Sequence, residues 1–148
     1  MRPIAVAIPL LAIGLLVAAC GGGVKPLATA PPADATQVVR QVPTPLAVNI
    51  DGLKPELAAL YRWAEANRAL VSRLPCYCGC GASQGHRSLQ DCFLIPTGGY
   101  DAHAATCGIC EREAVEARRL QGEGQDTSAI RAFIDANFGR FGAPTNTP

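Results

Sequence analysis

The residues best suited to chemistry in this chain are its cysteines, six of which lie between positions 76 and 110. Three of them alternate with other residues in the run Pro-Cys-Tyr-Cys-Gly-Cys-Gly. Thiols crowded in this way indicate a metal site, a set of disulfides or a redox centre. We therefore expect this segment to hold the domain together and to carry its function. The candidate residues are Cys76, Cys78, Cys80, Cys92, Cys107 and Cys110.

The N-terminus predicts the compartment in which these thiols lie. Arg2 precedes an apolar stretch over residues 4–17, and small residues follow it up to Cys20. This pattern is typical of a secretory signal peptide over residues 1–19, which is too short for a comfortable membrane span. Because a cysteine directly follows the small residues, the segment resembles a bacterial lipobox, which implies lipid attachment at Cys20 through acyl chains such as palmitate. A plain signal peptide or an uncleaved anchor is the alternative.

Charge gives no reason to expect nucleic acid as a partner. Without residues 1–19 the chain keeps 12 basic and 12 acidic residues, since Arg2 is the one charge removed. A chain with equal numbers of basic and acidic residues has no excess positive charge with which to attract an anionic polymer. We expect the chain on the extracytoplasmic face of the cell membrane, held there by its N-terminal lipid. An envelope protein or a metal acceptor is the further partner that we expect.

Proline content and apolar periodicity divide the chain into four segments. After the signal peptide, residues 20–50 are rich in Pro, Ala and Thr and predict an extended, disordered tether. Residues 51–139 predict a cysteine-rich domain, and residues 140–148 predict a disordered tail. Four Phe, three Tyr and one Trp are few for a stable core. A domain of this size therefore needs a covalent or metal staple.

Within residues 51–139 the pattern favours helices near 54–73, 107–121 and 127–138, with a single helical turn at 88–93. Pro55 suits a first helical position, and Pro75 stops the first helix directly before the cysteines. Cys110 shares one face of the second helix with Ala114 and Ala117. We therefore expect a mainly α fold, in which a small domain of about three helices surrounds a cysteine-rich loop.

Binding of soft metal is the leading interpretation of the six thiols. Gly79 and Gly81 permit the backbone angles with which a loop can turn alternating sulfurs towards one centre. Cys107 and Cys110 open a helix, whose positive end favours their thiolates. Six thiolates exceed the four that a tetrahedral zinc site takes, whereas bridging sulfurs let six cysteines hold several copper(I) ions. Copper(I) is therefore the first metal that we expect, and zinc the second.

The two histidines, His86 and His103, lie within the same segment. An imidazole nitrogen can add to a thiolate site, so either histidine is a candidate ligand. The alternative is that each caps a turn by hydrogen bonding. The sequence leaves this choice open.

Three other uses of the thiols remain. Six cysteines outside the cytoplasm can form three disulfides, in which case no metal is bound. Four cysteines can hold a structural zinc ion while the remaining pair forms a disulfide. Cys107 and Cys110 can form a thiol–disulfide exchange pair, although almost no strands accompany them. We identify no catalytic residues, so an enzyme is not expected and an oxidoreductase is only the weak alternative.

The cysteine-rich segment resembles a known family. The carrying motifs are Leu74-Pro75-Cys76-Tyr77-Cys78-Gly79-Cys80-Gly81, Gly85-His86, Asp91-Cys92-Phe93, Asp101-Ala102-His103 and Cys107-Gly108-Ile109-Cys110. Over about residues 53–138 they look like the PCYCGC-motif family of bacterial lipoproteins. The resemblance implies an extracytoplasmic lipoprotein and brings little biochemistry. From the residues, we expect a copper(I)-binding lipoprotein that buffers or delivers metal, with a disulfide- or zinc-stapled envelope interaction module as the alternative.

Overall fold

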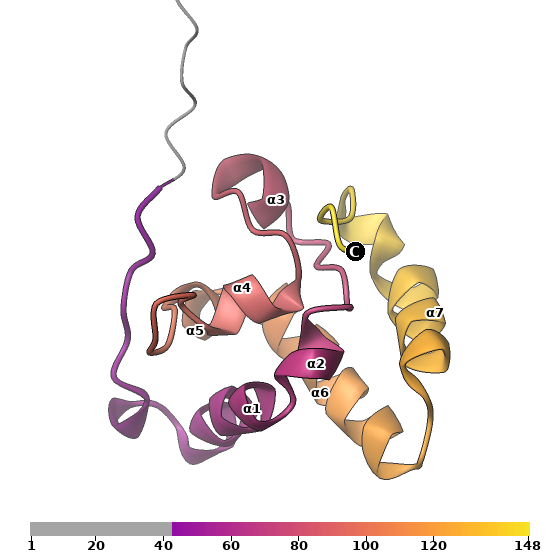
Figure 1. Ribbon diagram of the computed structural model, residues 1–148, viewed down its shortest axis with the longest axis horizontal. Helices are drawn as coiled ribbons and strands as arrows, with labels where there is room; N and C mark the ends of the chain where they lie inside the picture. The colour runs from indigo at the N-terminus through magenta and orange to yellow at the C-terminus, as the bar shows by residue number, and fades with distance from the viewer. Residues whose placement is uncertain (1–42) are drawn as a thin grey trace, which may run out of the picture. The chain divides into compact units, whose positions relative to one another are not determined.

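The computed structural model describes residues 43–148, and within this range it contains seven α-helices and two short 3-10 helices (Figure 1). β-structure in the same range is limited to two isolated antiparallel bridges, Ala47 with Asp101 and Leu94 with Tyr100. The expected mainly α fold is confirmed. The predicted signal peptide, Cys20 and most of the predicted tether lie outside the described residues. The helices are α1 (Pro55–Ala66), α2 (Arg68–Val71), α3 (Cys80–Ser83), α4 (Leu89–Phe93), α5 (His103–Thr106), α6 (Gly108–Gly122) and α7 (Thr127–Phe138).

The first predicted helix, 54–73, is interrupted at Asn67. Asn67 leaves the helical conformation at φ −119° and ψ 36°, and α2 starts directly after it. Its side-chain amide donates to the carbonyl of Trp63, and its amide oxygen accepts from Gln121 of α6. Trp63 donates its indole N–H to the same glutamine. Polar contacts to α6 therefore hold the interruption in place. The apolar pattern of the first helix gives no indication of these contacts.

Helix α6 is the element on which the domain is assembled, because it contacts α1, α4, α5 and α7 (Figure 1). Its buried face consists of Cys110, Glu113, Ala114, Ala117 and Leu120. The small alanines let the neighbouring helices approach closely. The predicted inward position is confirmed for Cys110, which is fully buried. Cys107, which the same pattern also placed inward, precedes the helix and is only half-buried.

Helix α7 follows its predicted bounds. Asp126 caps its N-terminus by accepting from the N–H of Ala129 at 2.8 Å. Ile130, Ile134 and Phe138 form its buried face, as their spacing predicts.

The expected disordered tail, residues 140–148, is instead packed against the cysteine-rich loop. Thr145 is only 5% exposed. Its hydroxyl accepts from the N–H of Cys76 at 2.9 Å, and its own N–H donates to the Cys76 carbonyl at 3.0 Å. A short segment without apolar periodicity is thus ordered because it pairs with the backbone of the loop.

The residues before position 51 also make contacts to the domain. Val48 donates its N–H to the carbonyl of Tyr100, and Ile50 is buried. The last residues of the predicted tether therefore belong structurally to the helical domain. Within the part of the chain that is described, no helix combines the length and apolarity needed to span a bilayer.

Candidate metal centre

The fold brings all six predicted cysteines and both histidines into one region of the domain. Each of the six thiols is unbridged, and they contact one another in overlapping groups of three or four donors. Within each group the sulfur and ring-nitrogen atoms lie within 4.8 Å of one another. The sites predicted from the sequence therefore converge in space, although they are spread over 35 residues.

Three of the sulfurs form a tight triangle. The Sγ atom of Cys76 lies 3.4 Å from that of Cys78 and 3.4 Å from that of Cys110, and the third side of the triangle is 3.6 Å. A disulfide would need about 2.05 Å. Two thiolates on one tetrahedral ion with metal–sulfur bonds of about 2.3 Å lie about 3.8 Å apart. The observed spacing is thus close to that of shared metal ligands and far from that of a covalent bond.

A second cluster lies beside this triangle. The Sγ atoms of Cys80 and Cys92 are 3.5 Å apart, and Nδ1 of His86 is 3.5 Å from Cys92 Sγ. The ring of His86 meets the ring of His103 edge to face, with centroids 5.0 Å apart. Each histidine therefore has a ring nitrogen in contact with a thiol, as a candidate ligand requires.

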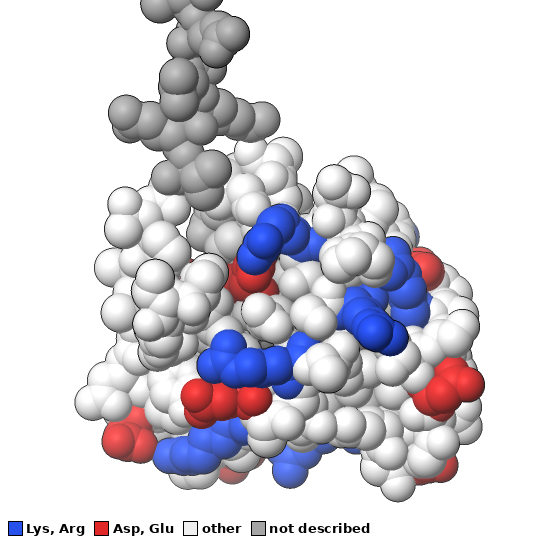
Figure 2. Space-filling model, viewed as in Figure 1, with Lys and Arg blue, Asp and Glu red and all other residues white. Residues whose placement is uncertain are grey.

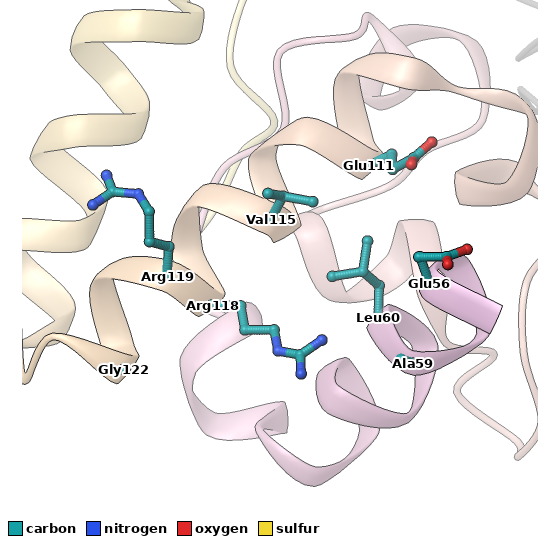
Figure 3. Close-up of a pocket in the computed structure, with 8 residues that line it drawn as sticks. All are labelled: Glu56, Ala59, Leu60, Glu111, Val115, Arg118, Arg119 and Gly122. Atoms are coloured by element: carbon teal, nitrogen blue, oxygen red, sulfur yellow. The ribbon is translucent and has the colours of Figure 1, made fainter.

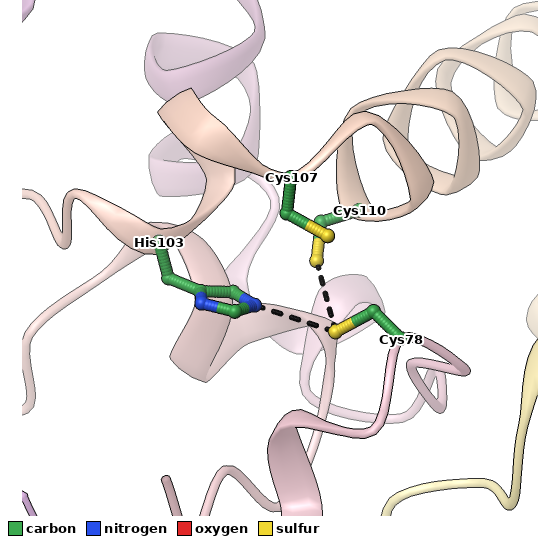
Figure 4. Close-up of side chains that lie close together, drawn as sticks. All are labelled: Cys78, His103, Cys107 and Cys110. Atoms are coloured by element: carbon green, nitrogen blue, oxygen red, sulfur yellow. Dashed lines mark hydrogen bonds between the residues drawn. The ribbon is translucent and has the colours of Figure 1, made fainter. Parts of the chain in front are cut away.

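His103 belongs to the group shown in Figure 4, together with Cys78, Cys107 and Cys110. Its Nε2 atom lies 3.3 Å from Cys78 Sγ. Cys107 and Cys110 come from the start of α6, and their sulfurs point towards the same space as the Cys78 sulfur (Figure 4). Three sulfurs and one imidazole nitrogen are a common four-ligand set for zinc, and the three thiolates alone suit copper(I).

Electrostatics make Cys78 the preferred thiolate of the metal-free centre. Hydrogen bonds donated by the thiols of Cys110 and Cys76 lower the pKa of Cys78 well below its usual value. The hydrogen bond with Cys78 in turn raises the pKa of His103 to about 10. In the metal-free centre these two residues therefore form a thiolate–imidazolium pair, which binding of a cation would replace.

The backbone of the cysteine loop is held in shape on two sides. Pro75 follows α2 and its turn, and Gly79 adopts φ 85°, a left-handed conformation that other residues rarely tolerate. On one side Thr145 pairs with the backbone of Cys76. On the other side the N–H of Tyr77 donates to Oε1 of Glu113 at 2.9 Å. These contacts point the two cysteines that flank Tyr77 towards α6.

Glu113 is a residue of the site that our sequence analysis missed. It is fully buried, and among the described residues its Oε2 is the buried side-chain polar atom without a hydrogen-bond partner. Burial raises the pKa of Glu113 to about 7, against the opposing hydrogen bonds from Cys76 and Tyr77. Its position three residues after Cys110 was the available signal, because residues at that spacing share one face of a helix.

Gln84 was also missed. Its Nε2 atom lies 2.8 Å from Nδ1 of His103, on the ring nitrogen opposite to the one that meets Cys78. Asp101 accepts from the backbone N–H of His103 at 2.8 Å. A ligating histidine is usually oriented by such a contact to its second nitrogen. Gln84 thus orients the imidazole towards the sulfurs.

A cavity of about 560 Å³ lies between α1 and α6 (Figure 3). Leu60 and Glu56 of α1 and Val115 and Arg118 of α6 are among the residues that line it. None of its lining residues is a cysteine or histidine. It is therefore separate from the candidate ligands.

The surface carries charges of both signs. On the face shown in Figure 2, basic and acidic side chains are interspersed. The ion pairs of the described residues include Arg87 with Asp91 at 3.0 Å and Arg119 with Glu123 at 2.6 Å. No extended field of one sign covers this face.

Comparison with known proteins gives one match. The sequence model of the family described as "Protein of unknown function with PCYCGC motif" matches residues 12–148. No curated protein and no solved structure matches the chain.

Proposed function

Since the chain belongs to the family of proteins of unknown function with the PCYCGC motif, we propose from its site that it binds soft metal ions, copper(I) first. The ligands are the six clustered thiols, with His86 and His103 as additional donors. The protein would take up, buffer or deliver the metal rather than transform a substrate.

One observation carries this proposal. Six unbridged thiols and two imidazoles meet in overlapping groups whose donor atoms lie within 4.8 Å of one another. Four of the thiols are fully or almost fully buried, namely Cys76, Cys80, Cys92 and Cys110. Binding of a metal cation would explain why unbridged thiols are buried so close to one another.

The number of donors favours more than one ion. Eight donors are twice the four that a tetrahedral site uses. Soft thiolates select copper(I), zinc or an iron–sulfur cluster, and thiolate sulfur can bridge two copper(I) ions. Copper(I) makes use of all six sulfurs, which is why we place it first.

Zinc is the second candidate, and a specific observation favours it. The group of Cys78, His103, Cys107 and Cys110 supplies three sulfurs and one nitrogen, a ligand set typical of structural zinc. A zinc centre would stabilise the domain and leave its activity to another surface. This is the metal form of the envelope interaction module that the sequence also allows.

Metal titration separates these candidates. The reduced full chain, kept anaerobic, is titrated with copper(I) and, separately, with zinc(II) against a colorimetric chelator, and elemental analysis counts the bound ions. We expect two or more tightly bound copper(I) ions. One equivalent or less of tightly bound copper(I) would contradict the proposal. A matched control is Cys20→Ser, which keeps all six clustered thiols and should bind the same amount.

The disulfide alternative has its own measurement. Mass spectrometry of protein purified from its native membrane without reductant would give a mass six hydrogens below that of the reduced chain if three bridges form. Protein that retains metal and all six thiols supports metal binding.

We further propose that the chain is a lipoprotein, anchored at Cys20 on the extracytoplasmic face of the membrane. The support is the signal-like N-terminus with a cysteine directly after small residues. Labelling of cells with radioactive palmitate should label the wild type and leave Cys20→Ser unlabelled. A soluble wild-type protein without label would overturn this part. A metal acceptor or another envelope protein is the partner that we propose.

A further inference from the structure

We infer that the centre contains two metal positions of unequal access, a closed inner one and an open outer one, and that Cys107 is the ligand through which the outer ion is exchanged. This inference rests on the metal binding proposed above. It adds how the metal would leave, and through which residue.

The eight donors divide evenly between two sets. The outer set is the group of Cys78, His103, Cys107 and Cys110. The inner set contains the four donors that remain, Cys76, Cys80, His86 and Cys92. In the inner set, Cys80, His86 and Cys92 share one group, and Cys76 shares further groups with Cys80 and with Cys92. The outer set thus supplies three sulfurs and one imidazole nitrogen around one point, enough for one zinc or one copper(I) ion. In the inner set, two sulfurs and the ring nitrogen of His86 lie together and suffice for one copper(I) ion, while the groups that contain Cys76 also contain a thiol of the outer set.

The two sets differ in burial. All three thiols of the inner set are at most 1% exposed, and His86 is its one half-buried donor. In the outer set Cys78, His103 and Cys107 are half-buried, and only Cys110 is fully buried. An approaching ligand therefore reaches the outer ion past three accessible donors and the inner ion past one.

Cys107 differs from the other five thiols in its contacts. Within the described residues each of the other five makes a hydrogen bond to a second sulfur, whereas the Cys107 thiol has no such partner. Cys107 also lies in extended backbone, at φ −120° and ψ 99°, between α5 and α6. It is therefore the outer ligand least held by its surroundings.

These differences define an exchange step. A thiolate or other soft ligand of an acceptor bonds to the outer ion as the bond from the metal to Cys107 Sγ breaks. The metal keeps its oxidation state, and the released Cys107 thiolate takes up a proton from water. The inner ion stays bound and maintains the fold while the outer one is transferred.

Kinetics of metal release test the inference. The full chain, reduced and saturated with copper(I) under anaerobic conditions, is mixed with an excess of a colorimetric copper(I) chelator. The wild type should release copper in two phases of similar amplitude. Cys107→Ser should lose the fast phase and retain the slow one, whereas the matched inner variant Cys92→Ser should lose the slow phase.

The outcomes separate this inference from the proposed function. Release of two or more ions in a single phase, or a fast phase that survives in Cys107→Ser, overturns the inference and leaves metal binding intact. Wild type that binds no copper(I) overturns both. Alkylation of the loaded wild type needs no variant to fold: iodoacetamide should modify Cys107 before any inner thiol, and modification of Cys80 or Cys92 first would contradict us.

Discussion

Two regions of the domain are buried: the interface between α6 and α7, and the thiol centre. Different forces hold each of them together. On the α7 side the buried residues are Ile130, Ile134 and Phe138, whose burial is favourable whatever the solution contains. The centre instead buries thiols and the carboxylate of Glu113, groups that gain from burial only when a partner satisfies them. The stability of the helical frame should thus be intrinsic, whereas that of the centre should depend on protonation and on the metal that we propose it binds.

Removing the metal should give the largest effect, and it tests directly whether the stability of the centre is separate from that of α7. Thiolate zinc sites contribute about 10–16 kcal/mol of apparent binding free energy in small domains. In the loaded protein we expect strong amide protection over residues 76–110, and in the metal-free reduced protein its loss there. Protection in α7 should persist. Hydrogen exchange followed by mass spectrometry measures both regions at once, and uniform loss along the chain would contradict the separation.

Ile134→Ala tests the frame. The side chain is fully buried in α7, which carries no ligand. Its truncation should lower the free energy of unfolding by about 2–5 kcal/mol. The decrease should be equal in the loaded and metal-free proteins, as measured by chemical denaturation. The matched control, Phe141→Ala, changes a residue that is 40% exposed and should cost less.

Glu113→Gln tests whether the stability of the centre depends on pH. The pKa of Glu113 is about 7 in the folded protein and 4.5 in its reference state, so folding favours its protonated form. The contribution of Glu113 to the stability of the metal-free wild type should therefore fall as pH rises from about 4.5 to 7 and then level off. The Gln variant lacks this titration and should be more stable than wild type at pH 8, by on the order of 3 kcal/mol.

At pH 4 the difference between Glu113→Gln and wild type should disappear, because the wild-type carboxyl is then protonated in both states. Thermal unfolding of both proteins across this range gives the profile. Glu111→Gln, two residues earlier on the same helix, is the control and should follow the wild-type profile. A pH-independent gap between Glu113→Gln and wild type would contradict the assignment.

Thr145→Val should give the smallest effect of the four. The substitution keeps the shape of the side chain and removes the hydroxyl that accepts from the buried N–H of Cys76. Leaving a buried donor unsatisfied costs about 1–3 kcal/mol. The loss should appear as faster exchange of the Cys76 amide, while α7 is unchanged. Ser72→Ala, which removes an exposed hydroxyl that donates to the Ala69 carbonyl, is the control.

The parts of the structure that follow from local pattern were predicted well. The bounds of α7 and the inward position of Cys110 on α6 depend on residues three or four apart, which the sequence displays directly. The six cysteines were likewise candidates from their type and spacing, and the two histidines from their place in the same segment, although the sequence left the role of the histidines open. Apart from the position of Cys110, the burial of the individual donors was not visible in the sequence.

The parts that were missed depend on long-range contacts. The interruption at Asn67 requires Gln121, which lies 54 residues away, and the order of the C-terminal segment requires the backbone of Cys76. Glu113 carried a weak local signal, since it shares a helix face with Cys110, but a buried glutamate goes against composition rules. Its partner, the N–H of Tyr77, becomes apparent only in the folded chain.

The pairing of Thr145 with Cys76 has a consequence for the order in which the protein matures. The two residues are separated by 69 positions, and the later one closes one side of the cysteine loop. During synthesis the loop emerges before the segment that contacts it. Until residue 145 follows, the backbone of Cys76 lacks this partner, so the loop should reach its final shape only once the chain is complete.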